Sequence, residues 1–167
     1  MVRFVFFLFL IASFVQGEDI EKEFLKEQIK SVPLNKAVIV GKGKERVLVF
    51  MNPDCPHCRK EWQELKGCLH KLRLYVFLVP FPRFPESYQK SAYVVCSKNH
   101  LRALDEVLSG KWDQRPLPVK SCPLLKEHER IAKEMGVSAV PYNILLRDYT
   151  VVSGYSPDLR KKLSCDR

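Results

Sequence analysis

Hydrophobic and polar residues are arranged along the chain in patterns that predict both helices and strands. The segment 21–29 carries apolar residues at helical spacing among charged ones, and Pro33 ends this predicted helix. Two apolar runs, 37–40 and 47–51, predict strands joined by a glycine-rich turn. Because the run 47–51 has no polar alternation, we expect that strand to be buried on both faces.

The pattern becomes helical from Pro56, shortly after the second predicted strand. The apolar stripe of this segment consists of Trp62, Leu65 and Leu69. The opposite, polar face consists of Lys60, Glu61 and Glu64. Such a division into two faces is typical of an amphipathic helix.

The rest of the chain adds one strand, more helices and a final strand pair. In order, we expect a strand at 72–79, a helical stretch over 87–108 broken near 98–99, a helix over 124–135, strands at 142–146 and 150–153, and a short helix after Pro157. This is the element order of a thioredoxin fold with a helical insertion between its βαβ half and its C-terminal ββα half. The predicted fold class is therefore α/β, without repeats or an interdomain linker.

The N-terminus predicts export. A basic start at Arg3, an apolar run over 4–15 and a small-residue exit are typical of a secretory signal, which we place at 1–17. The run is shorter than the ~20 apolar residues of a transmembrane helix, and an uncleaved membrane anchor is the alternative. In both cases the remainder is exported, as an N-terminal helical segment, 18–36, and a thioredoxin-like domain, 37–167.

The chain is basic, with a formal net charge of +9 at pH 7. Such a balance can indicate nucleic acid or an anionic membrane as partner. Here the lysines and arginines are scattered among acids, as in segment 126–130, and no basic run is interleaved with aromatic residues. We therefore expect a solvated basic surface and no nucleic-acid partner.

Six cysteines in an exported chain indicate disulfide chemistry. Two of them form the motif Cys55-Pro56-His57-Cys58, where the strand 47–51 gives way to a helix. Free N–H groups and the helix dipole favour an anion at such a position, so the pKa of Cys55 should be lowered. We expect Cys55 to be the exposed attacking thiol and Cys58 the deeper, resolving thiol.

The two residues between the cysteines suit this chemistry. Pro56 takes the first helical position, where its missing N–H costs nothing. His57 can add a positive charge or a hydrogen bond beside Cys55.

Two other roles are open to a Cys-x-x-Cys pair, namely a purely structural disulfide and a zinc site. Zinc needs two further ligands at short spacing, whereas His70, His100 and His128 are isolated, so no metal is expected. The dipeptide Val140-Pro141 favours redox chemistry, because in thioredoxin-like proteins a proline before this strand is cis and faces the active cysteines. An ordinary trans proline at a strand start is the alternative.

Further motifs follow the same order along the chain. They are DCPHCRK at 54–60, PFPR at 80–83, VCSKN at 95–99, LSGK at 108–111, Ser121-Cys122, GVSAVP at 136–141 and Gly154-Tyr155. The series resembles the catalytic domain of the periplasmic disulfide isomerases of the DsbC/DsbG type, over nearly the whole chain after the signal.

The resemblance implies a periplasmic thiol:disulfide interchange enzyme that needs no cofactor. Its substrates would be exported proteins that contain cysteines, held beside Cys55 by Val140 and Pro141. A redox partner, either a membrane oxidase or a membrane reductase, would reset the Cys55–Cys58 pair.

The resemblance also implies a structural disulfide between Cys96 and Cys122. Cys68 and Cys165 have no counterpart in it. Three states of these two cysteines are open: mutual pairing, free thiols, or a link to another chain.

The chain departs from the isomerases in three respects. Only 18–36 precedes the main domain, where the isomerases have a dimerisation domain, so we expect a monomer. The dipeptide Pro56-His57, and Val140 before the cis-proline position, instead match the oxidising DsbA type. Val49 stands where many relatives carry a buried acid, so the sequence identifies no proton acceptor for Cys58.

The expected function is disulfide exchange with exported proteins, as an oxidase or an isomerase. Two alternatives remain. One is a dedicated reductase, for example in cytochrome maturation, and the other is a redox-inert binding or chaperone module that keeps the fold.

Overall fold

The computed structural model describes residues 17, 20–119 and 121–166. The chain divides into two compact units, 1–32 and 33–167. In the first unit a helix covers 20–30, which confirms the helix predicted at 21–29. The secretory signal predicted at 1–17 lies outside the described residues except for Gly17.

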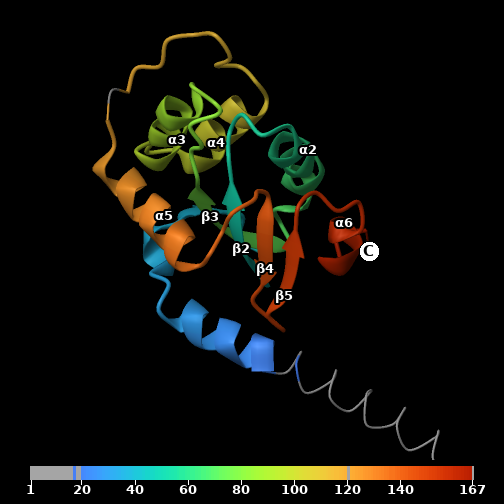
Figure 1. Ribbon diagram of the computed structural model, residues 1–167. Coiled ribbons are helices and arrows are strands. Elements are labelled where there is room, and N and C mark those ends of the chain that lie inside the picture. Colours follow the sequence, from blue (N-terminus) through green and yellow to red (C-terminus); the bar gives the residue numbers. More distant parts are fainter. Residues whose placement is uncertain (1–16, 18–19, 120, 167) are drawn as a thin grey trace, which may run out of the picture. The chain divides into compact units, whose positions relative to one another are not determined.

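The second unit is built on a five-stranded mixed sheet with the strand order β1-β3-β2-β4-β5 (Figure 1). The strands are β1 (Val38–Val40), β2 (Glu45–Met51), β3 (Leu72–Leu78), β4 (Tyr142–Leu145) and β5 (Thr150–Ser153). β2 and β3 run parallel, and the other three neighbouring pairs are antiparallel. The predicted α/β thioredoxin fold is thereby confirmed.

The glycine-rich segment between β1 and β2 does not form a hairpin, because β3 lies between these two strands. Instead, the segment passes very close to the backbone that leads into β3. A Cβ atom at Gly41, whose φ is +83°, would lie 2.2 Å from the Leu72 carbonyl oxygen. Glycine is therefore required here for both the left-handed backbone and the close approach.

The centre of the sheet forms the core of the unit. All five residues of the predicted run 47–51 are fully buried, which confirms that β2 is covered on both faces. The rings of Phe50 and Phe77 stack with their centroids 5.5 Å apart, on neighbouring strands. β2 therefore ends in a rigid part of the molecule, and the active-site motif begins there.

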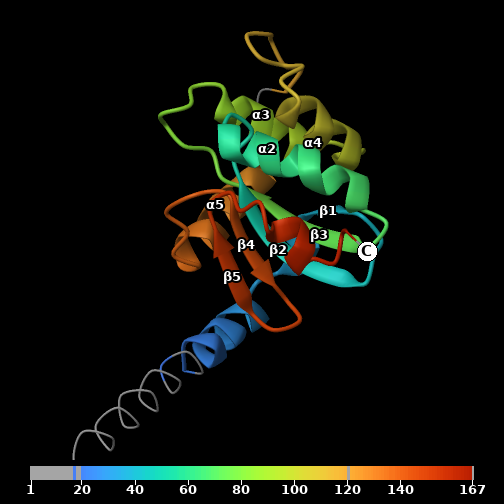
Figure 2. The ribbon, with the colours of Figure 1, turned by 90° about the vertical axis from the view of Figure 1, so that its right-hand side faces the viewer.

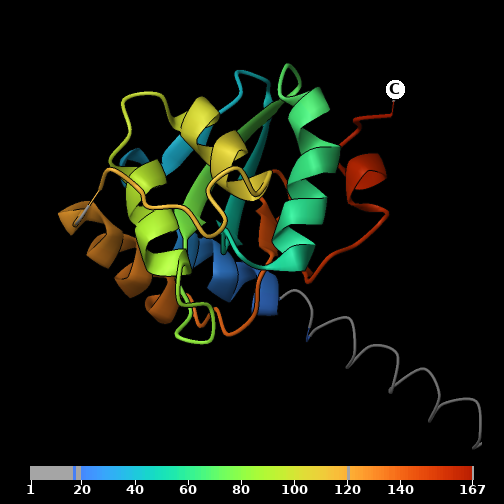
Figure 3. The same cartoon turned by 90° about the horizontal axis from the view of Figure 1, so that it is seen from above.

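The helices are α2 (Pro56–Leu65), α3 (Ser87–Val95), α4 (His100–Leu108), α5 (Pro123–Glu134) and α6 (Leu159–Lys162), with the short 3₁₀ turns η1 (Leu34–Lys36) and η2 (Lys66–Cys68). Helices α2, α3 and α4 lie together on one side of the sheet (Figure 2). Seen from above, α2 and α4 lie side by side (Figure 3). α3 and α4 form the predicted helical insertion, broken between the two helices as expected.

Helix α5 is joined to the sheet by His128, which is fully buried. Its Nδ1 accepts a hydrogen bond from the Leu78 N–H at 3.0 Å, and its Nε2 lies 2.8 Å from the Lys36 carbonyl oxygen, to which it donates. Both ring nitrogens are therefore used within the fold. Through the Lys36 carbonyl, His128 also joins α5 to η1 at the start of the second unit.

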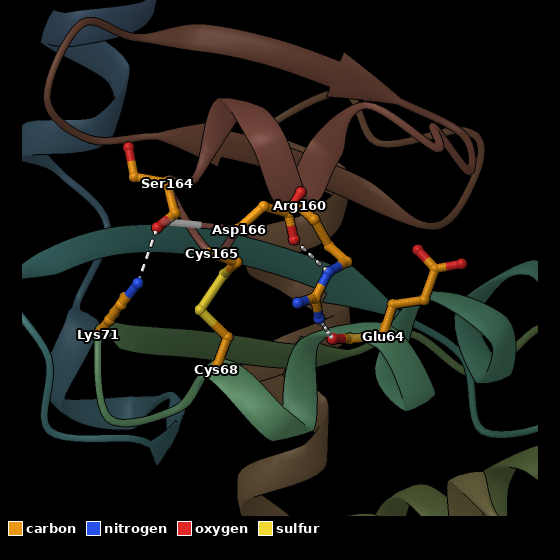
Figure 4. The surroundings of a disulfide bond; sticks show 7 residues. All are labelled: Glu64, Cys68, Lys71, Arg160, Ser164, Cys165 and Asp166. Carbon is orange, nitrogen blue, oxygen red and sulfur yellow. Dashed lines mark hydrogen bonds and ion pairs between the residues drawn. A yellow bond between two sulfur atoms is a disulfide. The ribbon is translucent and has the colours of Figure 1, made fainter.

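Two disulfides fasten the periphery of the second unit. Cys96–Cys122 joins the end of α3 to the start of α5, as the resemblance implied. Cys68 and Cys165 pair with each other, so η2, after the active-site helix, is bonded to the C-terminal segment (Figure 4). In the described part of the chain, no helix is long and apolar enough to cross a membrane.

Candidate active site

The motif begins at the end of β2 and opens helix α2. Cys55 is the N-cap residue of α2, and Pro56 follows at the first helical position, as predicted. Asn52 holds the segment between β2 and Cys55 in place. Its side-chain oxygen accepts a hydrogen bond from the Asp54 N–H, and its side-chain NH₂ donates to the Val79 carbonyl. The attacking cysteine is thus placed by the buried sheet rather than by a loose loop.

Cys55 and Cys58 are both thiols, and their surroundings act on the two in opposite directions. The pKa of Cys55 is lowered to about 6, chiefly by a hydrogen bond from the Cys58 thiol and further by the N–H groups of Cys58 and His57 and the charge of His57. The pKa of Cys58 is raised far above its usual range by burial and by the bond it makes to Cys55. A thiolate therefore forms at Cys55 first.

The prediction that Cys55 is exposed is wrong, since the residue is only 4% accessible. The cis-proline loop covers it. The Val140-Pro141 peptide bond is cis, as predicted, and the Val140 carbonyl oxygen lies 3.6 Å from the Cys55 sulfur. Cys58 is completely inaccessible, so Cys55 remains the outer of the two thiols.

His57 is exposed and lies against the C-terminal segment. Its ring stacks on Tyr155 with centroids 6.3 Å apart, and the Lys60 ammonium lies 4.2 Å from the centre of the same ring. The Tyr155 hydroxyl donates a 2.6 Å hydrogen bond to Glu64. The sequence motif that contains Tyr155 does not predict this contact with His57.

An ion-pair network adjoins the motif on the side of the helical insertion. Lys90 of α3, whose side chain is 1% exposed, places Nζ 2.5 Å from Asp54 Oδ1, 2.7 Å from a Glu86 oxygen and 2.5 Å from Asp113 Oδ1. Arg59 bonds to Asp54 at 2.9 Å and to both oxygens of Asp113 at 2.7 Å. The residues on either side of the Cys-x-x-Cys motif are therefore held to the insertion.

The same network borders a cavity of about 440 Å³, whose lining is completed by Phe84, Pro85 and Gln114. Asp54, Glu86 and Asp113 bring carboxylate oxygens within 4.8 Å of one another, a spacing suited to a metal ion. The Lys90 ammonium contacts all three carboxylates and Arg59 contacts two of them, so cations of the chain itself already occupy this position.

Glu61 is the site residue that sequence reasoning placed wrongly. The polar pattern predicts Glu61 on the polar face of α2, but it is 1% exposed and lies on the buried face with Cys58, Trp62 and Leu65. Both of its oxygens accept hydrogen bonds from Asn143 Nδ2, at 3.0 and 3.1 Å. Burial raises the pKa of Glu61 to about 8. The spacing of three residues from Cys58 was the signal that could have revealed this position.

Comparison with known proteins agrees with this geometry. The model of the thioredoxin-like domain family matches residues 17–159. A probable thiol:disulfide interchange protein DsbC of Bordetella avium is 27% identical over 155 residues, which cover 87% of this chain and 54% of that protein. The chain thus spans about half the length of this curated relative.

Solved structures share the fold. A disulfide interchange protein from Neisseria gonorrhoeae is 24% identical, with a TM-score of 0.68 over 80% of this chain and 97% of that one. The thiol-disulfide exchange protein alpha-DsbA2 from Wolbachia pipientis is 14% identical, with a TM-score of 0.63 over 89% and 98%. DsbG of Helicobacter pylori is 17% identical, with a TM-score of 0.61 over 80% and 65%. The chain therefore belongs to the thioredoxin-like domain family.

Proposed function

We propose that the protein is a thiol:disulfide oxidoreductase that acts on exported proteins, as an oxidase or an isomerase, through Cys55 and Cys58. The observation that carries the proposal is the placement of Cys55 at the N-cap of α2, against the cis-proline loop, with Cys58 buried behind it. This placement shifts the pKa values of the two thiols in opposite directions. A thiol whose pKa is about 6 is mostly thiolate at neutral pH and is both a nucleophile and a good leaving group.

In the oxidising direction, a client thiolate attacks the Cys55 sulfur of the Cys55–Cys58 disulfide, and the bond between the two cysteines breaks. A second client thiolate then attacks the client sulfur of this mixed disulfide. Cys55 leaves as a thiolate, the client gains a disulfide, and the enzyme keeps both electrons as a dithiol. The cis-proline loop, which already contacts Cys55, is the surface along which the client backbone would lie.

In the isomerising direction, the Cys55 thiolate attacks a client disulfide and forms the mixed disulfide itself. A different client thiolate then displaces Cys55, so the client exchanges one pairing for another without net oxidation. If this does not happen, Cys58 attacks the Cys55 sulfur and releases a reduced client. Such release is also the reaction of a dedicated reductase, which is the second candidate.

The proposed compartment is the periplasm, reached through the N-terminal signal. The proposed partners are client proteins with cysteines and a membrane oxidase or reductase that resets the pair. We propose a monomeric protein, which distinguishes it from the dimeric isomerases.

The test is the equilibrium of Cys55–Cys58 in glutathione buffers, with the remaining cysteines kept in their disulfides. A potential near about −120 mV supports an oxidase, and one towards about −200 mV or below supports an isomerase or a reductase. The Cys55→Ser variant should lose all exchange with a reduced or scrambled client. A wild-type pair that does not cycle in any buffer would refute the enzyme and leave the redox-inert module.

A further inference from the structure

The Cys58 thiol carries a proton that must leave before the mixed disulfide can be resolved. Cys58 is completely buried, and burial strongly favours its protonated form. Within the described part of the chain, its sulfur has one polar contact besides Cys55, a 3.4 Å hydrogen bond from the Asn52 N–H. This N–H can stabilise a thiolate but cannot take a proton. A base within the buried region is therefore needed.

Glu61 is placed to be that base. It lies three residues after Cys58 on α2, so the two side chains project from the same buried face of the helix. Among the described residues, no cation lies within ion-pair distance of its carboxylate. A buried carboxylate without a cationic partner is costly, and such a group takes up a proton readily.

Asn143 gives Glu61 a partner in either protonation state. Its Nδ2 donates to both carboxylate oxygens when Glu61 is ionised. Its Oδ1 is buried and has no hydrogen-bond partner in the described part of the chain. A protonated Glu61 would supply an O–H group that this oxygen can accept. The amide therefore accommodates the gain of a proton by Glu61 without leaving a new unsatisfied donor.

Asn143 is itself held firmly. It is fully buried on β4, two residues after the cis-proline, and pairs in register with Val49 of the central strand. Directly opposed residues of antiparallel strands share one face of the sheet. The carboxylate is thus fixed between the active-site helix and the strand that follows the cis-proline loop.

We infer that Glu61 is the proton acceptor for the Cys58 thiol, with Asn143 as its positioning residue. This inference rests on the proposed function. During resolution the S–H proton of Cys58 passes to the Glu61 carboxylate, and the Cys58 sulfur forms a bond to the Cys55 sulfur. The bond between Cys55 and the client breaks, and the client sulfur leaves as a thiolate that takes its proton from solvent. When the Cys55–Cys58 disulfide is opened again, Glu61 returns its proton to Cys58.

Few other charges act on this proton. Cys55 and Glu64 both raise the pKa of Glu61 by repulsion when they are ionised. Two charged groups on neighbouring elements have other partners. Asp105 of α4 accepts a hydrogen bond from the Trp62 ring N–H, and Arg160 of α6 donates to the Glu64 carbonyl oxygen. The pH dependence of resolution should therefore follow Glu61 itself, whose pKa is about 8.

The reaction of the dithiol protein with the aromatic disulfide DTNB separates the two steps. Attack by Cys55 releases one thionitrobenzoate, and attack by Cys58 on the resulting mixed disulfide releases a second. In Glu61→Gln we expect the first phase to stay within about twofold of wild type. The second phase should slow by about 100-fold, the usual effect of losing a general base. Glu61→Asp should recover part of this rate.

The pH profile distinguishes proton transfer from a merely structural effect. The second phase of wild type should rise with pH around pH 8 and level off above about pH 9, where Glu61 is mostly ionised. In Glu61→Gln it should keep rising in proportion to hydroxide. Glu127→Gln, which removes a carboxylate from the exposed side of α5, is the matched control and should behave as wild type.

The Glu61→Gln variant should fold, because a glutamine amide at position 61 can pair with both polar atoms of Asn143.

Titration of the Glu61 carboxyl carbon by NMR in the wild-type dithiol protein gives a second test that needs no variant. An unchanged second phase and pH profile in Glu61→Gln, or a Glu61 that titrates below about pH 5, would overturn the inference while leaving the exchange activity intact. Release of a single thionitrobenzoate by wild type would instead contradict the proposed function, because Cys58 would then not resolve the mixed disulfide at Cys55.

Discussion

At the scale of single residues, Cys55 and Cys58 show how position alone separates two identical groups. Cys55 is the N-cap of α2, where N–H groups and the neighbouring thiol favour its anion. Cys58 is the first residue on the buried face of the same helix and is inaccessible to solvent. The sequence motif predicts this division of roles, but the close cover that the cis-proline loop gives Cys55 depends on a segment far along the chain.

The alkylation of Cys55 should reveal its shifted pKa directly. Because the pKa is about 6, the rate of iodoacetamide modification in the native dithiol protein should rise from about pH 5 and level off above about pH 7. Cys58 should stay unmodified, since it is inaccessible. Peptide mass spectrometry after a timed pulse reports the two sites separately.

The variant Cys58→Ser serves as the control for this measurement. The hydrogen bond from the Cys58 thiol is the largest cause of the low pKa of Cys55, and a serine hydroxyl can replace much of it. The midpoint should therefore stay well below the ordinary value. A midpoint near pH 9 in wild type would contradict the assignment.

At the scale of helices and strands, the apolar pattern predicts the elements well. Every predicted strand and helix exists within the described residues. The elements of the second unit bury apolar residues, which is what the apolar pattern reports, whereas the helix 20–30 buries only Ile29. The pattern could not predict the pairing of β1 with β3, since a short apolar run does not specify its neighbour. It also placed Glu61 on the wrong face, because large apolar residues alone define a stripe that is too narrow.

The buried Lys90 could not be predicted either, since its three carboxylate partners come from three separate segments. Removing it should be costly. In Lys90→Ala, Asp54, Glu86 and Asp113 lose a shared cation, and we expect about 3 kcal/mol lower free energy of unfolding. Urea unfolding measures the loss, and Lys98→Ala, at an exposed position after α3, should change little. A loss below about 1 kcal/mol in Lys90→Ala would show that Arg59 suffices to balance the cluster.

The contact between α5 and β3 should make stability depend on pH. Burial lowers the pKa of His128 to about 4 in the folded state, against 6.5 for an ordinary histidine. The unfolded chain therefore binds a proton that the folded state excludes. The contribution is full above about pH 6.5 and decreases as the pH falls towards 4, by about 3 kcal/mol in total.

Urea unfolding of wild type and His128→Gln at pH 7.5 and 4.5 isolates this effect from that of the carboxylates. The free energy of unfolding should fall with acid by more in wild type than in the variant. Equal losses in the two proteins would show that His128 does not carry the dependence.

At the scale of the whole molecule, the Cys68–Cys165 disulfide spans 97 residues and encloses most of the second unit. In the chain-entropy model a loop of this length contributes about 4–5 kcal/mol, against about 3 kcal/mol for the 26-residue separation of Cys96 and Cys122. The double variant Cys68→Ser/Cys165→Ser should lower the free energy of unfolding by about 4 kcal/mol. Cys96→Ser/Cys122→Ser is the matched comparison and should cost less.

Activity should respond less than stability to the loss of the Cys68–Cys165 bond. Arg160 still donates to the Glu64 carbonyl, and the Tyr155 hydroxyl still bonds to the Glu64 side chain (Figure 4 shows Arg160 and Glu64). The Cys55 pKa, followed by the alkylation pulse described above, should therefore stay near 6. A large rise would show that the C-terminal segment holds the active-site helix through the disulfide.

The two structural disulfides are nested: Cys96–Cys122 lies inside the interval closed by Cys68–Cys165. A chain that emerges from a translocation channel and is oxidised in the order of its cysteines would join Cys68 to Cys96 and strand Cys122 until Cys165 arrives. The native pairing requires either that Cys68 stay reduced until Cys165 arrives or that a first, wrong bond be undone. The protein for which we propose disulfide exchange would thus depend on the same chemistry to form its own two structural disulfides.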